Sequence, residues 1–358
     1  MNVHKDNLNN VNITDESILM TPSQLKALYP LSQEGAKFIA EARKTISNII
    51  HKRDHRLLIV CGPCSIHDVD AAIEYAHKLK ALSDSLSDNL YIVMRVYFEK
   101  PRTTVGWKGL INDPHMDGSF AIEEGLQKAR KLLLELTKIG LPLATEALDP
   151  NSPQYLGDLF SWSAIGARTT ESQTHREMAS GLSMAVGFKN GTDGSLDTAI
   201  NALRSAAMPH SFVGINQQGQ VALLKTQGNP DGHIILRGGK CPNYKKEDIL
   251  ACEAALAKAN IEPSLMIDCS HANSNKDYRN QPLVARNTKE QILEGNRSIT
   301  GLMIESNLFE GNQSSECPKN EMVYGVSVTD SCISFDSTID ILKELNDELS
   351  SVLRSRFA

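Results

Sequence analysis

The 358-residue sequence contains no long hydrophobic run, since its longest apolar stretches, at 57–61 and 90–94, hold about five residues. A membrane-spanning helix needs roughly 20, so we expect no membrane partner. The N-terminal sequence MNVHKDNLNNVNITDE also lacks the apolar segment of a secretion signal. Excess positive charge is missing as well, because the formal net charge is −6, and this argues against binding to nucleic acid. The 41% hydrophobic and 22% charged residues are typical of a soluble globular protein.

A disulfide framework is not expected either. The chain has seven cysteines, an odd number, which predicts reduced thiols and a cytoplasmic location. Cys61 and Cys64 have the CxxC spacing of a thioredoxin-like redox motif, which is an alternative function of a different class. Against it, Cys61 ends the apolar run LLIVC and is typical of a buried core residue. A redox motif would also leave the polar residues at the other strand ends without a role.

From residue 57 onward, strand-like apolar runs alternate with helical segments, which predicts an α/β fold with a parallel sheet. Eight strands, each followed by a helix, give the count of a (β/α)8 TIM barrel. Two of the helices are predicted to begin after the capping residues Asp68 and Ser119. The predicted strands are 57–62, 90–97, 142–146, 163–167, 184–188, 233–237, 264–268 and 300–305.

Two segments lie outside this count. Residues 1–56 predict an Asn-rich arm followed by two helices, an N-terminal extension to a catalytic barrel at 57–358. Within the barrel, residues at about 211–226 (SFVGINQQGQVALLKT) form two β-rich runs around a Gln-Gln-Gly turn, which predicts an inserted β-hairpin. Because a barrel closes without an arm or a hairpin, we expect both to bury surface against another subunit of a homo-oligomer.

Each predicted strand has a polar or reactive residue at its end or just beyond it. The carboxyl ends of barrel strands meet at one rim, where the active sites of this fold lie, so these residues predict a single site. The cations among them suit a ligand with both phosphate and carboxylate groups. The positions are Cys64, Arg95 with Lys100, Glu146, Arg168, Lys189, Arg237, His271 and Glu305.

The segment after the second predicted strand is the most unusual. Arg95 lies among apolar strand residues, where an unpaired guanidinium costs several kcal/mol. Lys100 and Arg102 flank Pro101, which ends the strand. Three cations within eight residues favour an anionic ligand, although a solvated loop is the alternative interpretation.

The sequence FEKPRTTVGWKGLINDP in this segment closely resembles the substrate-binding segment of type I 3-deoxy-D-arabino-heptulosonate 7-phosphate (DAHP) synthases. GPCSIHD is a second match, shared in outline with 3-deoxy-octulosonate 8-phosphate synthases. GARTTESQ, GFKNGTDG, ILRGGK and DCSHANS then occur in the order expected for DAHP synthases. The resemblance extends from about Thr21 to the C-terminus and includes the hairpin.

The resemblance implies a transferase that condenses phosphoenolpyruvate with erythrose 4-phosphate and water, giving DAHP and phosphate in the shikimate pathway of aromatic amino-acid biosynthesis. Condensation of the octulosonate type, with arabinose 5-phosphate, is the alternative. The implied cofactor is one divalent metal ion (Mn, Fe, Co, Zn or Cu) held by Cys64, His271, Glu305 and Asp330. Lys100, His271 and Glu305 are implied in proton transfer. Phosphoenolpyruvate would contact Arg95, Lys100, Glu146, Ala167, Arg168, Lys189 and Arg237, and erythrose 4-phosphate Arg102 and Thr103.

The family is typically dimeric or tetrameric, and its members divide into isoforms inhibited by phenylalanine, tyrosine or tryptophan. The hairpin here resembles the tyrosine-sensitive type. Phenylalanine-sensitive relatives have serine at the position of Gly214, where a side chain would fill the space for a phenolic hydroxyl. The alternative interpretation is that the apolar members of the set form only the hairpin core. The implied effector residues are Asn10, Pro153, Gln154, Met178, Leu182, Ser183, Phe212, Gly214 and Leu224.

Overall fold

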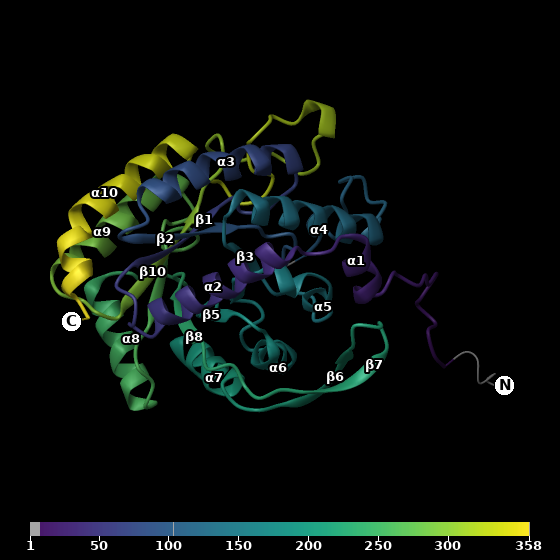
Figure 1. Ribbon diagram of the computed structural model, residues 1–358, viewed down its shortest axis with the longest axis horizontal. Coiled ribbons are helices and arrows are strands. Elements are labelled where there is room, and N and C mark those ends of the chain that lie inside the picture. The colour runs from purple at the N-terminus through teal and green to yellow at the C-terminus, as the bar shows by residue number, and fades with distance from the viewer. Residues whose placement is uncertain (1–7, 103, 358) are drawn as a thin grey trace.

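The computed structural model of the protein describes residues 8–102 and 104–357. Eight parallel strands of this part of the chain close into a barrel in the order β1-β10-β9-β8-β5-β4-β3-β2 (Figure 1). The predicted fold class is therefore confirmed. The strands are β1 (Leu57–Gly62), β2 (Leu90–Arg95), β3 (Leu143–Glu146), β4 (Trp162–Ile165), β5 (Ala185–Lys189), β8 (Gly232–Leu236), β9 (Leu265–Asp268) and β10 (Ile299–Glu305).

Helices surround the barrel on its outer face (Figure 1). In the described part of the chain, no helix is long and apolar enough to cross a membrane. The helices are α1 (Pro22–Leu28), α2 (Gln33–Ile50), α3 (Val69–Ser85), α4 (Ile122–Ile139), α5 (Ser152–Leu156), α6 (Gln173–Gly181), α7 (Leu196–Ala206), α8 (Lys246–Lys258), α9 (Gln281–Leu293) and α10 (Phe335–Ser355), with short 3-10 turns at Gly157–Leu159, Tyr278–Asn280 and Lys319–Glu321.

The barrel strands are buried on both faces, which explains why they are continuous apolar runs rather than alternating ones. In β1, Ile59 and Cys61 belong to the core between strands and helices, whereas Leu58 and Val60 belong to the barrel interior. Helix α2 adds Ile46 and its neighbours Ile49 and Ile50 to the interior core. The interior is thus filled with side chains, and the carboxyl ends of the strands remain for a site.

The predicted hairpin is confirmed as an antiparallel pair, β6 (Ser211–Ile215) and β7 (Val221–Lys225), separate from the barrel. Its turn is held by Gln217, whose backbone carbonyl accepts from Ser23 N and whose side chain contacts Lys26 and Gln154. The hairpin is therefore fixed to α1 and α5. The division of the chain into an N-terminal extension at 1–56 and a catalytic barrel at 57–358 stays a prediction.

One of the two predicted helix caps is wrong. Asp68 caps α3 by accepting the backbone N–H groups of Asp70 and Ala71. Ser119 does not cap α4, which begins at Ile122 without a side-chain cap. The intervening Phe120 has a φ of 50°, a left-handed conformation that cannot start a right-handed helix.

Candidate active site

A cavity of about 390 Å³ opens where the barrel strands end. Polar side chains from most of the strand-end loops line it, as the sequence predicts for this rim. Thr103, a predicted substrate contact, lies outside the described residues. The predicted site residues that line the cavity are Lys100, Arg102, Glu146, Ala167, Arg168, Lys189, Arg237, His271 and Asp330.

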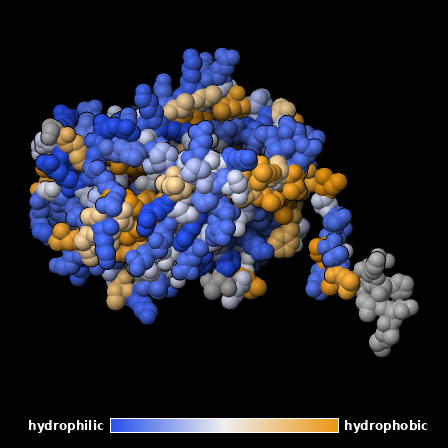
Figure 2. Space-filling model, turned by 90° about the horizontal axis from the view of Figure 1, so that it is seen from below, coloured by the Kyte–Doolittle hydropathy of each residue, from blue (hydrophilic) through white to orange (hydrophobic). Residues whose placement is uncertain are grey.

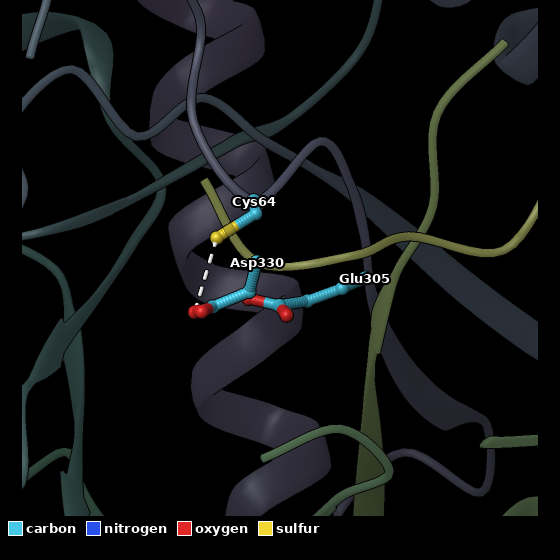
Figure 3. A group of neighbouring side chains, drawn as sticks. All are labelled: Cys64, Glu305 and Asp330. Carbon is cyan, nitrogen blue, oxygen red and sulfur yellow. Dashed lines mark hydrogen bonds between the residues drawn. The ribbon is translucent and has the colours of Figure 1, made fainter. Parts of the chain in front are cut away.

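Cys64, Glu305 and Asp330 converge at the base of this mouth (Figure 3). Each offers one ligand atom, and these atoms all lie within 4.8 Å of one another. His271 is the fourth predicted member, with its Nε2 at 3.9 Å from both Glu305 Oε1 and Asp330 Oδ2. Thiolate, imidazole and carboxylate groups at this spacing could hold a first-row divalent metal ion.

The Cys64 thiol is hard to ionise in this cluster. Burial raises the pKa of the Cys64 thiol to about 12, and the Glu305 carboxylate acts in the same direction. Lys100 is nearby, with its Nζ at 3.1 Å from Cys64 Sγ, and Arg95 pairs with Glu305. A bound metal ion would lower the pKa of the thiol and stabilise the thiolate as its ligand.

Asp268, at the end of β9, links the candidate metal ligands to the candidate substrate-binding cations. Its Oδ2 lies 2.9 Å from His271 Nδ1 and 3.3 Å from Lys189 Nζ. Burial works to raise the pKa of Asp268, but the charges of His271 and Lys189 outweigh it and hold the pKa well below its usual range. A single carboxylate thus orients a candidate metal ligand and a candidate substrate-binding cation.

The sequence analysis did not assign a role to Asp268 or to Ser270, whose hydroxyl donates to Glu305 Oε2 at 2.7 Å. Both lie within the DCSHANS motif, and a carboxylate next to a candidate ligand was the available signal. The backbone gives a further sign of function here. His271 has a φ of 54°, a conformation that non-glycine residues adopt rarely and that often marks functional sites.

The buried guanidinium of Arg95 is stabilised by several partners. Its guanidinium lies 3.0 Å from Glu305 Oε1 and donates to the carbonyl oxygens of Pro63 and Cys64. The ring of Tyr97 stacks against it, with the centroid 3.9 Å from Cζ. Arg95 therefore lies beneath the mouth, 1% exposed, and its contact with substrate stays a prediction.

Gly166, after β4, leaves room for the Glu146 carboxylate. A Cβ atom built on Gly166 would overlap the Glu146 carboxylate, so a side chain would displace that group from the mouth. Glu146 Oε1 is buried and has no hydrogen-bond partner among the described residues. Its free lone pairs face a position where a ligand or water would satisfy them.

The two cysteines of the CxxC motif do not act as a pair. Cys61 Sγ lies in the core, 3.3 Å from the Tyr75 hydroxyl, whereas Cys64 Sγ is next to Lys100 and Asp330. Burial raises the pKa of the Cys61 thiol to about 11 and that of Cys64 to about 12. Redox motifs need a lowered thiol pKa, so this geometry argues against the thioredoxin-like alternative.

The predicted effector residues lie in separate groups. Phe212 pairs with Leu224 across the hairpin, and a Cβ on Gly214 would lie 2.7 Å from Leu224 Cδ1, so these three share one face. Pro153 and Leu182 line a small cavity next to Glu146. The remaining members are Gln154, which contacts Gln217, Met178 on α6, and two exposed residues, Ser183 and Asn10 of the arm.

Comparison with known proteins decides the family. The sequence profile of the DAHP synthetase I family matches residues 29–343. The chain belongs to the DAHP synthetase I family. Membership of this family confirms the expected enzyme class. The closed barrel with its inserted hairpin is the fold expected for the family.

Individual relatives support the same assignment to the DAHP synthetase I family. The Tyr-sensitive phospho-2-dehydro-3-deoxyheptonate aldolase of Escherichia coli K12 is 71% identical over 99% of this chain and 100% of the relative. The Phe-sensitive enzyme of the same organism is 52% identical, over 96% of this chain and 97% of its own length. A solved phospho-2-dehydro-3-deoxyheptonate aldolase structure from Francisella tularensis SCHU S4 has a TM-score of 0.92 and 48% identity, covering 96% of this chain and 99% of that one.

The variant Asp268→Asn tests the link that Asp268 makes between the candidate metal ligands and the candidate substrate-binding cations. An amide has no negative charge to pair with Lys189 and is a weaker acceptor for His271 Nδ1, so we expect metal affinity to fall about 10–100-fold. Titration of divalent metal into metal-free protein measures the change. The control Asp277→Asn removes a carboxylate of the same loop whose partner is the exposed Arg279, and should leave affinity unchanged. Equal affinities for Asp268→Asn and the unmodified protein would contradict the link.

Proposed function

We propose that this member of the DAHP synthetase I family condenses phosphoenolpyruvate with erythrose 4-phosphate in the mouth of the barrel. In this proposal the predicted site residues have the roles given above. The observation that supports this best is that one cavity holds the predicted cations next to the acidic cluster of Cys64, Glu305 and Asp330. Two phosphates and a carboxylate need such cations, because their mutual repulsion is strong in a dry site.

The cations are arranged around the mouth in a way that suits two anionic substrates. Arg168 follows β4, Lys189 is the last residue of β5, and Arg237 follows β8. These three strands are neighbours in the barrel. In the proposal they bind the phosphate and carboxylate of phosphoenolpyruvate. Arg102, on the loop after β2, binds the phosphate of the aldose.

The proposal includes one divalent metal ion held by Cys64, His271, Glu305 and Asp330. The close spacing of the ligand atoms and their combination of thiol, imidazole and carboxylate groups support it. Bound there, the ion supplies Lewis acidity toward the aldehyde oxygen. Soft and borderline donors in this set admit Mn, Fe, Co, Zn or Cu.

In the reaction, C3 of phosphoenolpyruvate bonds to the aldehyde carbon, water attacks C2, and phosphate leaves from C2. Lys100 is positioned to donate a proton or a hydrogen bond to the alkoxide that forms. Burial works to lower the pKa of Lys100, but the acidic groups of Cys64 and Asp330 outweigh it and raise the pKa, so the amine stays charged. In the proposal, His271 or Glu305 helps to deliver that proton.

The purified protein should release phosphate from phosphoenolpyruvate when erythrose 4-phosphate is added, and a strong chelator should abolish this activity. Cys64→Ser should lose at least about 100-fold because a ligand is missing. Cys61→Val, its matched control in the core, should keep most activity. Equal or better turnover of arabinose 5-phosphate would favour the octulosonate-type reaction, and full activity of Cys64→Ser in chelator would remove the metal from the proposal.

We also propose feedback inhibition by tyrosine, bound between the hairpin and its neighbouring helices. The geometry at Gly214 supports this, since a serine side chain there would contact Leu224 and reduce the space on the inner face. In the proposal, the space left by Gly214 admits a phenolic hydroxyl and polar groups pair with it, which phenylalanine would leave unpaired.

Among the three aromatic amino acids, tyrosine should inhibit most strongly. Gly214→Ser should raise its half-inhibitory concentration about tenfold or more, because overpacking costs roughly 1–3 kcal/mol, while turnover without inhibitor is unchanged. The control Ala251→Ser adds the same hydroxyl to an exposed position of α8. Strongest inhibition by phenylalanine or tryptophan would show that the Gly214 argument is wrong.

The protein should assemble as a dimer or tetramer. Hydrophobic side chains gather where the arm leaves the body and continue along the arm (Figure 2), with Ile18 fully exposed. The outer face of the hairpin exposes Val213, Val221 and Leu223. Apolar surface of this kind marks an interface. Sedimentation at micromolar concentration should give a multiple of the 39.3 kDa chain mass, and a monomer would refute this.

Seven free thiols support a reducing, cytoplasmic location.

A further inference from the structure

Glu99 is a buried carboxyl group that the proposed mechanism does not use. It directly precedes Lys100 on the segment after β2, and only 7% of it is exposed. On one side it lines a small, mainly apolar cavity of about 30 Å³, whose other walls include Phe98, Phe160 and Met184. On the other side it lines a groove of about 510 Å³ beneath the N-terminal arm and the hairpin turn. Its carboxyl group therefore lies in a partition between an apolar cavity and solvent.

The groups that face Glu99 are acidic or neutral. Asp149 lies between β3 and α5, Glu146 ends β3, and Ser152 begins α5. Among the described residues that line the two cavities, none is a lysine, arginine or histidine. An ionised Glu99 would thus be a buried charge without a counter-charge, beside a second carboxylate.

The burial of the two neighbours differs. Glu99 is buried, whereas Asp149 is exposed to solvent, so desolvation acts on Glu99 and favours its neutral form. Burial raises the pKa of Glu99 to about 8, and the charge of Asp149 adds to this against the opposing effects of the Ser152 side chain and the Asp149 backbone.

We propose that Glu99 is a positioning residue that, as a neutral carboxylic acid packed against the start of α5, holds Lys100 in the mouth. This inference rests on the proposed role of Lys100. The backbone N–H of Lys100 donates to Lys108 O, which ties the residue after Glu99 to the loop that follows. Asp149 lines the groove side of Glu99, so ionisation sets two carboxylates against each other there and displaces Glu99 from the start of α5, and the adjoining Lys100 moves with it.

The sign of the pH dependence follows from the proton count. Between its ordinary pKa of 4.5 and about 8, Glu99 binds a proton in the folded protein but not in the unfolded chain. Its contribution to stability therefore falls as pH rises through this interval and is constant above it. Positioning of Lys100 is intact below pH 8 and is lost above it.

The variant Glu99→Gln tests this, because an amide has the shape of the neutral acid and cannot ionise. At pH 7 the variant should retain activity with kcat within about threefold. By pH 9 the ratio of its kcat/KM to that of the unmodified enzyme should be about tenfold larger than at pH 7, mainly through KM for phosphoenolpyruvate. Glu99→Ala, which removes the contact, should raise KM at every pH. Glu34→Gln, at an exposed position of α2, is the matched control and should follow the unmodified profile.

Superimposable pH profiles for Glu99→Gln and the unmodified enzyme would overturn the inference, whereas an unmodified enzyme inactive at pH 7 would overturn the proposed function instead. A second readout needs no activity. Infrared spectra of the unmodified protein with isotope-labelled glutamate should show a protonated carboxyl band at pH 7 that disappears with a midpoint near 8. Absence of that band would also overturn the inference.

Discussion

The mouth of the barrel depends on the buried ion pair between Arg95 and Glu305. Their closest nitrogen and oxygen lie 3.0 Å apart, and neither side chain is more than 1% exposed. Removing one partner from such a pair costs roughly 3–5 kcal/mol, so the ends of β2 and β10 are held at the same height on either side of β1. The same guanidinium binds the carbonyl oxygens of Pro63 and Cys64, so it also fixes the loop of the candidate thiol ligand.

Opposite charges lie close together in this mouth. Cations line the open part of the cavity, and the candidate metal ligands converge beneath it, with Arg95 and Lys100 beside them. Asp268 joins the two groups because it contacts Lys189 and His271 with one oxygen. A change in the charge of either partner therefore acts on the other through this one buried carboxylate.

The barrel could be predicted because each strand is a short apolar run, and β1 has the predicted bounds. The rim could be predicted as well, since parallel strands bring their ends together whatever their order. The start of α4 could not, because it depends on the left-handed conformation of Phe120. Contacts such as Ser270 with Glu305 join residues 35 positions apart and have no local signal. The full set of metal ligands came from resemblance alone, because its members are scattered through the chain.

That scatter has a consequence for synthesis on the ribosome. Cys64 and Asp330, which meet in the folded protein, are 266 positions apart in the chain. At about 5–20 residues per second, the thiol emerges roughly 15–50 s before its carboxylate partner exists. Closure of the barrel must also wait, because β1 pairs with β10. For this interval the nascent chain presents an unprotected thiol to oxidants and stray metal ions, so one candidate metal ligand is exposed before the site that would bury it has formed.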